Sequence, residues 1–413
     1  MAIVVQKFGG SSVANYECMQ RVREQVTQRL REGYKVVVVL SAMSGETDRL
    51  LNLAYSFSDR PDPAETDVLL ATGEQTSVSL FTMTLLDNGI QARSMLGFQI
   101  PMHTDRTYGG ARILDIDANN LKNKLQNNDV LVVAGFQGCD FQHSLTTLGR
   151  GGSDTSAVAL AAALDASFCE ISTDVDGVYT TDPGICPQAR KLERITYDEM
   201  LEMASGGAKV LQIRSVEFAK KYGVTLHVRS TFNDEPGTLL VQEDDTMEAV
   251  MVSGIAYDKD QAWITLVDVS DEPGVASRIF EPFASSGIVV DMIVQNPSRD
   301  GRTDITFTVN RNNLDRAMEI IKEIQEDIGA REILYDPGVA KISVVGVGMR
   351  SHSGVAAIAF KALQWEGINI LIISTSEIKI SCLVEEKYAE LAVRVLHEAF
   401  GLDQAQVEPV KDA

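Results

Sequence analysis

The sequence contains few histidines and few cysteines, and its cysteines are not paired. Five of each occur in 413 residues, and the cysteines, at Cys18, Cys139, Cys169, Cys186 and Cys382, form no Cys-x-x-Cys motif. A zinc signature of that kind is therefore excluded, and we expect reduced thiols. The chain opens with no charged-then-apolar leader, and no apolar run approaches the length of a membrane span. These absences predict a cytoplasmic protein with no membrane partner.

Positive charge and the common nucleotide motifs are also scarce. Lys and Arg number 37 against 58 Asp and Glu, a net charge of −21. This charge argues against nucleic acid as a partner, and an anionic substrate would need local positive contacts. No Gly-x-x-x-x-Gly-Lys-Ser/Thr occurs, and Gly149-x-Gly151-x-x-Asp154 lacks the third glycine of a dinucleotide fingerprint. A Walker-type ATPase and a Rossmann dehydrogenase are both disfavoured.

The opening stretch predicts an anion site. Ala2–Val5 has the β-branched composition of a buried strand and leads to Gly9-Gly10, after which Ser11 or Ser12 could cap a helix that begins near Asn15. Backbone amides at paired glycines can approach a phosphate closely. Lys7, at the end of the strand, could reach a phosphate oxygen. The alternative is an ordinary tight turn with a surface lysine.

A second glycine cluster, Leu148–Ser156, follows the apolar strand Asp129–Phe136. Ser153 or Asp154 is expected to cap the Ala-rich helix Ala157–Ala166. Arg150 lies inside the cluster, and its guanidinium is suited to bidentate contact with a carboxylate. The stretch therefore predicts a second anion-binding helix start.

Alternating strands and helices predict a parallel α/β sheet for the first part of the chain. Lys35–Leu40 is a second buried strand, separated from the first by a helix, and it leads directly to Ser41 and Thr47. Ligands of such sheets bind at the carboxyl ends of the strands. Glu74 lies in a predicted helix over Asp67–Leu86, where residue type alone favours a solvated helix face.

The last third of the chain contains an internal repeat. The acidic segment Asn233–Glu248 predicts a domain boundary, and beyond it a β-α-β-β-α pattern occurs twice. The two copies begin at Trp263–Val267 and Ile342–Val347. The first copy gains a strand at Arg331–Tyr335, whereas Val250–Tyr257 has no place in it and could complete the second copy.

Four motifs occur in one order and carry a resemblance to a known family. They are Lys7-Phe-Gly-Gly-Ser-Ser12, Arg150-Gly-Gly-Ser-Asp154, Thr173-Asp-Val-Asp-Gly-Val-Tyr179 and Gly207-Ala-Lys-Val-Leu211. Together they resemble the aspartate kinases of the amino-acid kinase superfamily. The chain departs from many relatives at Gln212-Ile213-Arg214, where those read His-Pro-Arg.

The resemblance implies both the fold and the domain limits. The fold would be the amino-acid-kinase three-layer sandwich with a mostly parallel sheet, followed by two βαββαβ ferredoxin-like ACT modules. The catalytic domain would cover residues 1–232 and a linker 233–249. The first ACT region would cover 250–335, of which 250–257 could belong to the second module, and the second ACT module 336–413.

The resemblance also implies an activity, the ATP-dependent phosphorylation of the aspartate side chain to 4-phospho-L-aspartate. This is the first step toward lysine, threonine and methionine. The acceptor carboxylate is ionised at neutral pH, so the reaction needs no general base, which agrees with the scarcity of histidine. Mg²⁺ would arrive with ATP, and we expect no dedicated metal site.

Residue roles follow from the matched motifs. Lys7 and Asp154 are expected to be catalytic. Aspartate would contact Ser41, Thr47, Glu74, Arg150, Gly151, Gly152 and Ser153. ATP would contact Lys7, Phe8, Gly9, Gly10, Thr173, Asp174, Tyr179, Thr180, Thr181, Asp182, Pro183 and Lys209.

The ACT modules imply feedback inhibition by lysine, threonine or both. Effector contacts are expected at Asp271, Gly274, Val275, Asp291 and Gln295, with Ser353, Asn369 and Ile370 at the corresponding places of the second copy. Such modules pair edge to edge, which implies a homo-oligomer or a hetero-oligomer with a separate ACT-only subunit.

Two alternatives remain open at this stage. One is another member of the superfamily, acting on glutamate, acetylglutamate or a nucleoside monophosphate, although such enzymes are not expected to carry the doubled C-terminal module. The other is a small-molecule sensor with an inactive kinase half. Intact Lys7, Arg150 and Asp154 argue against the sensor.

Overall fold

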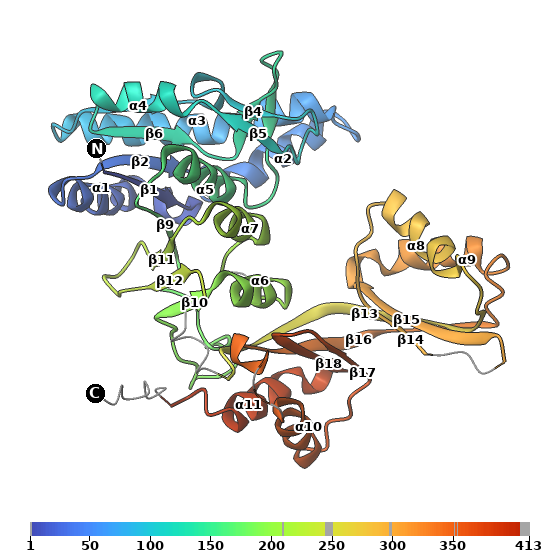
Figure 1. Cartoon of the computed structure of the whole chain (residues 1–413). Coiled ribbons are helices and arrows are strands. Elements are labelled where there is room, and N and C mark those ends of the chain that lie inside the picture. The colour runs from blue at the N-terminus through green and yellow to red at the C-terminus, as the bar shows by residue number, and fades with distance from the viewer. Residues whose placement is uncertain are drawn as a thin grey trace. The chain divides into compact units, whose positions relative to one another are not determined.

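The computed structural model describes residues 2–208, 210–243, 251–296, 300–350, 352 and 354–404. Two compact units contain them (Figure 1). The first unit is formed by residues 1–179, 191–205 and 209–245, and the second by residues 180–190, 206–208 and 246–413. Lys209 and Ser353, two of the predicted site residues, lie outside the described residues. Among the described helices, none is both long and apolar enough to cross a membrane.

The first unit is built on an eight-stranded sheet in the order β10-β12-β11-β9-β1-β2-β6-β3. Every pairing in it is parallel except that of β11 with β12. The strands are β1 (Ile3–Phe8), β2 (Lys35–Leu40), β3 (Ala92–Met95), β6 (Val130–Ala134), β9 (Phe168–Thr173), β10 (Arg194–Thr196), β11 (Leu226–Ser230) and β12 (Thr238–Val241). The parallel α/β class expected from the sequence is thus confirmed.

Seven α-helices and a small second sheet also belong to the described part of this unit. The helices are α1 (Tyr16–Arg31), α2 (Glu46–Phe57), α3 (Pro63–Asp87), α4 (Ala118–Gln126), α5 (Gly152–Leu164), α6 (Tyr197–Ser205) and α7 (Ile213–Tyr222). The second sheet runs β5-β4-β7-β8, formed by β4 (Met102–Thr104), β5 (Ile113–Ile116), β7 (Gln137–Cys139) and β8 (Leu145–Thr147).

Both predicted helix caps of the glycine clusters are wrong. Asn15 caps α1 by accepting from the Cys18 amide, while Ser11 and Ser12 lie in a short 3-10 helix, η1 (Gly10–Val13). Helix α5 begins at Gly152, five residues before the expected start, and its cap is Gly151 in the left-handed conformation (φ 69°). Ser153 and Asp154 are therefore inside the first turn, because the left-handed turn at Gly151, which glycine adopts without strain, already begins the helix.

Part of the expected linker is a strand. Thr238 and Leu240 are buried, whereas Leu239 is 37% exposed, so this short stretch has the alternation of a half-buried strand. It forms β12 and pairs with β10 and β11. The acidic composition of the surrounding segment concealed this alternation.

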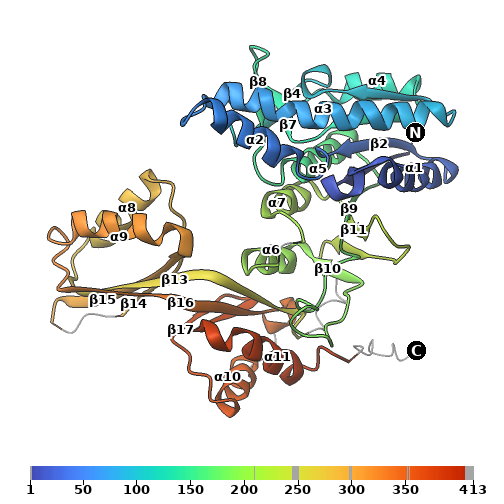
Figure 2. The ribbon, with the colours of Figure 1, turned by 180° about the vertical axis from the view of Figure 1, so that it is seen from behind.

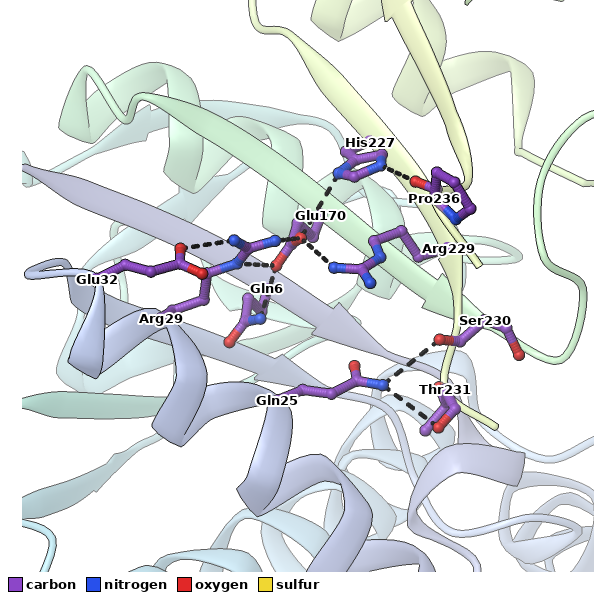
Figure 3. A network of polar contacts seen from close by, with 10 residues as sticks. All are labelled: Gln6, Gln25, Arg29, Glu32, Glu170, His227, Arg229, Ser230, Thr231 and Pro236. Atoms are coloured by element: carbon purple, nitrogen blue, oxygen red, sulfur yellow. Dashed lines mark hydrogen bonds and ion pairs between the residues drawn. The ribbon is translucent and has the colours of Figure 1, made fainter. Parts of the chain in front are cut away.

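A buried carboxylate fixes helix α1 to the centre of the first sheet. Glu170, on β9 and 1% exposed, accepts hydrogen bonds from Gln6 of β1 (2.6 Å) and from Arg29 of α1 (Nε, 3.1 Å, and Nη2). Figure 3 shows these groups converging on Glu170, together with His227 (Nδ1, 3.6 Å) and Arg229 (Nη1, 3.4 Å) of β11. The network, called the Glu170 cluster below, ties one helix to three strands.

The second unit contains one six-stranded antiparallel sheet in the order β14-β15-β13-β16-β18-β17. Its strands are β13 (Gly254–Ser270), β14 (Val290–Gln295), β15 (Arg302–Asn310), β16 (Glu332–Val345), β17 (Ile372–Thr375) and β18 (Lys379–Glu385). Its helices are α8 (Val275–Ser285), α9 (Leu314–Ile324), α10 (Val355–Trp365) and α11 (Ala389–Ala399). Both views place α8 and α9 on one face and α10 and α11 on the other (Figures 1 and 2).

The two copies of the repeat share two long strands. Residues 254–258 of β13 pair with residues 341–345 of β16, and farther along the same strands residues 263–267 pair with 332–336. The sequence suggested two separate strands in each case, because Asp258-Lys-Asp-Gln261 and Asp336-Pro-Gly-Val339 look like turns. The structure instead has bulges there, at which the pairing register shifts and the strands continue.

Alternation along β13 assigns its side chains to two cores. Ile255 packs in the core formed with α10 and α11, while Ile264 and Leu266 pack in the core formed with α8 and α9. Odd-numbered and even-numbered positions of a strand point to opposite faces. One strand therefore serves both modules.

Candidate active site

The candidate site of the first unit lies at the carboxyl ends of β1, β2 and β9. Lys7 is the penultimate residue of β1, opposite Val39 of β2 and Ile171 of β9 in the parallel register. Its neighbour Gln6 belongs to the Glu170 cluster, so strand alternation directs Lys7 to the other face of the sheet. This arrangement brings Lys7 to the start of α5.

Lys7 and Asp154 form an ion pair. The distance from Lys7 Nζ to Asp154 Oδ1 is 2.6 Å, and each side chain is 12% exposed. Asp154 lies in the first turn of α5, where the helix dipole favours an anion. A cation held beside a helix N-terminus in a glycine-rich turn is an arrangement suited to phosphate oxygens.

Glycines at this site allow close backbone approach. A Cβ on Gly10 would lie 2.7 Å from the carbonyl oxygen of Ala42, and one on Gly135 would lie 2.8 Å from Ser153 Cβ. The loops after β1, β2 and β6 therefore pack so closely that no side chain fits at Gly10 or Gly135. The Gly9 amide is already used in part, since it donates to Ser172 O at 3.4 Å.

Glu74 is buried, contrary to the solvated helix face that residue type favoured. The side chain lies on α3 and is 3% exposed, with Oε1 accepting from the Ala42 amide at 3.0 Å. Its other oxygen, Oε2, has no hydrogen-bond partner among the described residues. Burial raises the pKa of Glu74 to about 7, although the Ala42 amide opposes the shift. A buried carboxylate with a vacant acceptor is a candidate for binding a ligand cation.

Arg150 lies in an exposed turn whose flanking backbone is hydrogen-bonded by neighbouring side chains. Gly149 and Gly151 flank it with positive φ angles of 75° and 69°. Buried Asp67 of α3 accepts from the amide and the hydroxyl of Thr147, both at 2.7 Å, at the end of the strand before the turn. Arg214 donates to Leu148 O at 2.9 Å. The turn therefore presents Arg150 on a fixed backbone.

Sequence reasoning missed these supporting residues. Asp67 was only the first residue of a predicted helix, and Arg214 was noticed only as part of a departure from the family pattern. The neighbouring Gln212 packs over the turn so closely that a Cβ on Gly151 would lie 2.0 Å from Gln212 Cγ. No residue-type signal distinguishes such roles, because they depend on which loops meet.

The predicted nucleotide residues fall in both units. Thr173, Asp174 and Tyr179 belong to the first unit, and Thr180, Thr181, Asp182 and Pro183 to the second. The predicted effector residues that the structure describes are all in the second unit. Among them, Gly274 begins α8 with φ 96°, and Val275 is buried in the core of the first module and so offers only its backbone.

Asp291 already has a partner within the chain. The structure places it on β14, where its carboxylate pairs with the ammonium of Lys341, a residue that is 3% exposed. Gln295, at the end of the same strand, is exposed. An effector ammonium would therefore have to share Asp291 with Lys341.

Comparison with known proteins places the chain in a family. Residues 2–230 match the amino acid kinase family, and residues 263–326 and 342–400 each match the ACT domain. The aspartate kinase of Pseudomonas putida is 55% identical over 98% of both chains. The structure of E. coli aspartokinase III in complex with aspartate and ADP, in the R-state, is 26% identical and covers 96% of this chain and 99% of that one, with a TM-score of 0.79.

A second structure of the same E. coli enzyme, in complex with lysine and aspartate in the T-state, covers the same shares of both chains at 26% identity, with a TM-score of 0.77. Full-length coverage by enzymes of one kind leaves little room for the other superfamily members or for an unrelated sensor. The chain belongs to the amino acid kinase family and, within it, to the aspartate kinases that carry two ACT domains.

Proposed function

We propose that the chain transfers the γ-phosphoryl group of ATP to the side-chain carboxylate of aspartate. A bond forms between a carboxylate oxygen and the γ-phosphorus, the bond from that phosphorus to the β,γ-bridging oxygen breaks, and ADP leaves. The products are ADP and 4-phospho-L-aspartate. The observation that carries this proposal is the Lys7–Asp154 pair at the start of α5, beside two glycine-rich turns.

Catalysis at such a site consists of positioning and charge neutralisation. The nucleophile is already an anion, so the obstacle is its repulsion from the triphosphate. Lys7 would neutralise charge on the transferring group, and Asp154 would hold the Lys7 ammonium in place. Of the four glycine amides expected to bind phosphate oxygens, those of Gly10 and Gly151 would do so, because those of Gly9 and Gly152 already donate to Ser172 O (3.4 Å) and Gly149 O (2.9 Å).

The residues present also fit an Mg²⁺ that arrives with the nucleotide. Mg²⁺ commonly binds through one or two carboxylates, substrate phosphates and water, and Asp154 offers a carboxylate at the turn. Within the described residues, no group of three or more His, Cys, Asp or Glu side chains could hold a metal ion without the nucleotide. When bound, Mg²⁺ supplies charge neutralisation on the phosphates.

Aspartate recognition would use opposite charges at two points. Glu74, with its vacant buried oxygen, would accept the substrate ammonium, and Arg150 would bind a carboxylate. Ser41, Thr47 and Ser153 would add hydrogen bonds. The nucleotide would contact Phe8, Thr173, Asp174, Tyr179 and Thr180 to Pro183, with Lys209 assigned from its motif alone.

The test of this function is a turnover assay with ATP, Mg²⁺ and aspartate in which hydroxylamine traps the acyl phosphate. Glutamate and acetylglutamate serve as alternative carboxylate acceptors, and uridine monophosphate, whose product is not an acyl phosphate, is followed by the release of ADP instead. Hydroxamate formed from aspartate, at a kcat/KM at least about a hundredfold above that of the other acceptors, is the expected result. Preference for another acceptor, or no turnover with any, would contradict the proposal.

The buried position of Glu74 predicts a pH dependence for aspartate binding. Because its pKa is raised to about 7, Glu74 is largely protonated below that pH in the free enzyme and cannot accept the substrate ammonium. We expect kcat/KM for aspartate to fall about tenfold per pH unit below pH 7, while KM for ATP stays nearly constant.

The matched variant is Glu74→Gln, which should raise KM for aspartate and lose this acid limb. A wild-type profile that is flat between neutral pH and about pH 5 would show that Glu74 does not bind the ammonium.

We also propose that lysine, threonine or both inhibit the enzyme through the ACT domains. The left-handed Gly274 at the start of α8 leaves backbone amides accessible to an α-carboxylate, and exposed Gln295 of β14 could bind a polar group. The proposed assembly is a homo-oligomer, or a hetero-oligomer with a separate ACT-only subunit. Inhibition would stabilise a less active state of that assembly.

Gln295→Ala is the cleaner test of the effector site, because Asp291 also pairs with Lys341. We expect the concentration of lysine or threonine that gives half inhibition to rise at least about tenfold, with uninhibited kcat unchanged. Gln364→Ala, on the exposed face of α10, is the control and should retain wild-type inhibition. Full activity of the wild-type enzyme at saturating lysine plus threonine would refute the regulatory proposal.

A further inference from the structure

The segment Thr180–Arg190, which carries four of the proposed nucleotide residues, belongs to the second compact unit together with both ACT domains. Within that unit it contacts the beginning of β13 and the end of α11. The Thr180 carbonyl accepts from the Ile255 amide at 2.7 Å, and Ile185 packs against the core of the second ACT module. The nucleotide segment is thus built on a regulatory module.

Thr180 is held by a side chain of the ACT module as well as by backbone. Its hydroxyl oxygen lies 2.9 Å from His397 Nε2 and accepts from the Arg190 amide at 2.9 Å. Because the oxygen already accepts one hydrogen bond from the backbone, the hydroxyl proton can be donated to a neutral His397. Burial lowers the pKa of His397, with Asp403 opposing and Arg190 adding to the shift, which is consistent with a neutral imidazole.

Asp182 is held by a tyrosine of the same module. Tyr257, on β13, donates its hydroxyl to Asp182 Oδ2 at 3.0 Å, and the Gly184 amide donates to Asp182 Oδ1 at 2.8 Å. Burial and the Asp182 carboxylate raise the pKa of Tyr257 to about 12, so the phenol keeps its proton. The carboxylate of Asp182 is therefore oriented from two sides.

A second nucleotide-side segment meets the same tyrosine. Gly207 lies in the motif whose Lys209 is assigned to ATP by resemblance, and its φ is 109°. A Cβ at that position would lie 2.0 Å from the Tyr257 carbonyl oxygen. The first residues of β13 therefore contact both the segment Thr180–Arg190 and Gly207, which precedes Lys209 by two residues.

The segment also contains a buried hydroxyl group, that of Thr181, without a hydrogen-bond partner among the described residues. Thr181 is 4% exposed. An unpaired buried hydroxyl is costly unless a ligand or water satisfies it. Its position next to Thr180 points to a ligand at this segment.

We propose that His397 and Tyr257, from the second ACT module, are positioning residues for the nucleotide: they fix Thr180 and Asp182 in the conformation that binds ATP. This inference rests on the proposed function, which assigns Thr180 to Pro183 to the nucleotide. Neither residue touches the reacting atoms. The module that is expected to serve regulation is thereby also part of the architecture of nucleotide binding.

The test uses the full-length protein and two pairs of variants. Tyr257→Phe removes one hydroxyl, and Tyr335→Phe, at an exposed position of β16, is its control. His397→Leu removes the acceptor for Thr180, whereas the amide of His397→Gln can replace the imidazole Nε2. ADP binding in the presence of Mg²⁺ is measured by calorimetric titration, and KM for ATP and for aspartate by initial rates.

We expect Tyr257→Phe and His397→Leu to raise Kd for ADP and KM for ATP roughly 3- to 10-fold, the effect of losing one hydrogen bond. KM for aspartate and the thermal midpoint should stay near wild-type, and His397→Gln and Tyr335→Phe should bind ADP normally. The loss of kcat should be small beside the change in KM for ATP.

Unchanged ADP affinity in both variants would overturn the inference. An equal rise of KM for ATP and KM for aspartate in Tyr257→Phe and His397→Leu would also overturn it. So would a thermal midpoint that is lowered in His397→Leu and in His397→Gln alike, because either result indicates a merely structural role. Failure of the proposed function is distinguishable: a wild-type enzyme that binds ADP but does not phosphorylate aspartate contradicts the function, and the ADP titrations still decide the role of His397 and Tyr257.

Discussion

Lys7→Ala is expected to lower kcat about 10²- to 10³-fold while the protein stays folded. The magnitude is that of removing one group that stabilises charge in a transition state. The Lys7 ammonium reaches the first turn of α5 through its 2.6 Å ion pair with Asp154. Hydroxamate formation measures the loss, and circular dichroism checks the fold.

The control is Lys35→Ala, which removes a lysine at the opposite end of the neighbouring strand β2, where it pairs with Asp129. We expect that variant to keep wild-type kcat. A Lys7→Ala enzyme with more than about a tenth of wild-type turnover would show that the phosphate site lies elsewhere.

Glu170→Gln is expected to lower the free energy of unfolding of the first unit by about 3–5 kcal/mol, the usual cost of breaking a buried ion pair. Burial alone would raise the pKa of Glu170, yet hydrogen bonds from His227, Arg29 and Gln6 and the charge of Arg29 hold it at about 2. Without the carboxylate, the guanidinium groups of Arg29 and Arg229 face a neutral amide.

The same shift gives the pH dependence of this effect. A carboxyl whose pKa is lower in the folded state than its ordinary 4.5 stabilises the fold above that value, and the contribution is lost as the pH falls from about 4.5 toward 2. The difference between wild-type and Glu170→Gln in urea unfolding should therefore be largest at neutral pH and shrink in acid. Equal differences at all pH values would contradict this account.

Glu32→Gln is the matched control, since Glu32 pairs with the same Arg29 at 2.7 Å but is 37% exposed (Figure 3). Solvent screens such a pair, so the variant should cost less than about 1 kcal/mol. A loss as large as that of Glu170→Gln would mean that helix α1 is held mainly from its exposed side.

The sequence predicted the features that depend on local pattern. Strand β1 with its glycine pair, the second glycine cluster and the doubled module all follow from runs of apolar residues broken by glycine. The ordered motifs around Lys7 and Arg150 indicated the family of the chain, and the comparisons confirm that family. The roles of individual site residues stay predictions.

Features that depend on distant contacts could not be predicted from local pattern. Glu74 is buried because the loop after β2 covers it through the Ala42 amide, which no helix periodicity reveals. Thr180 belongs with the ACT modules because His397, 217 residues away in sequence, contacts its hydroxyl. Helix α5 starts early because Gly151, and not a side chain, begins it.

The two long strands of the second unit also constrain which changes of chain length the protein can tolerate. Ile255 and Ile264 point to opposite cores, and the bulges between them, one on β13 and one on β16, restore the original pairing register by Trp263. A deletion of one codon between Trp263 and Leu266 would invert the facing of the side chains from that point to the register shift between Leu266 and Val269. Removal of two adjacent codons would preserve it. In this stretch, natural or engineered variation in length should therefore occur in steps of two residues.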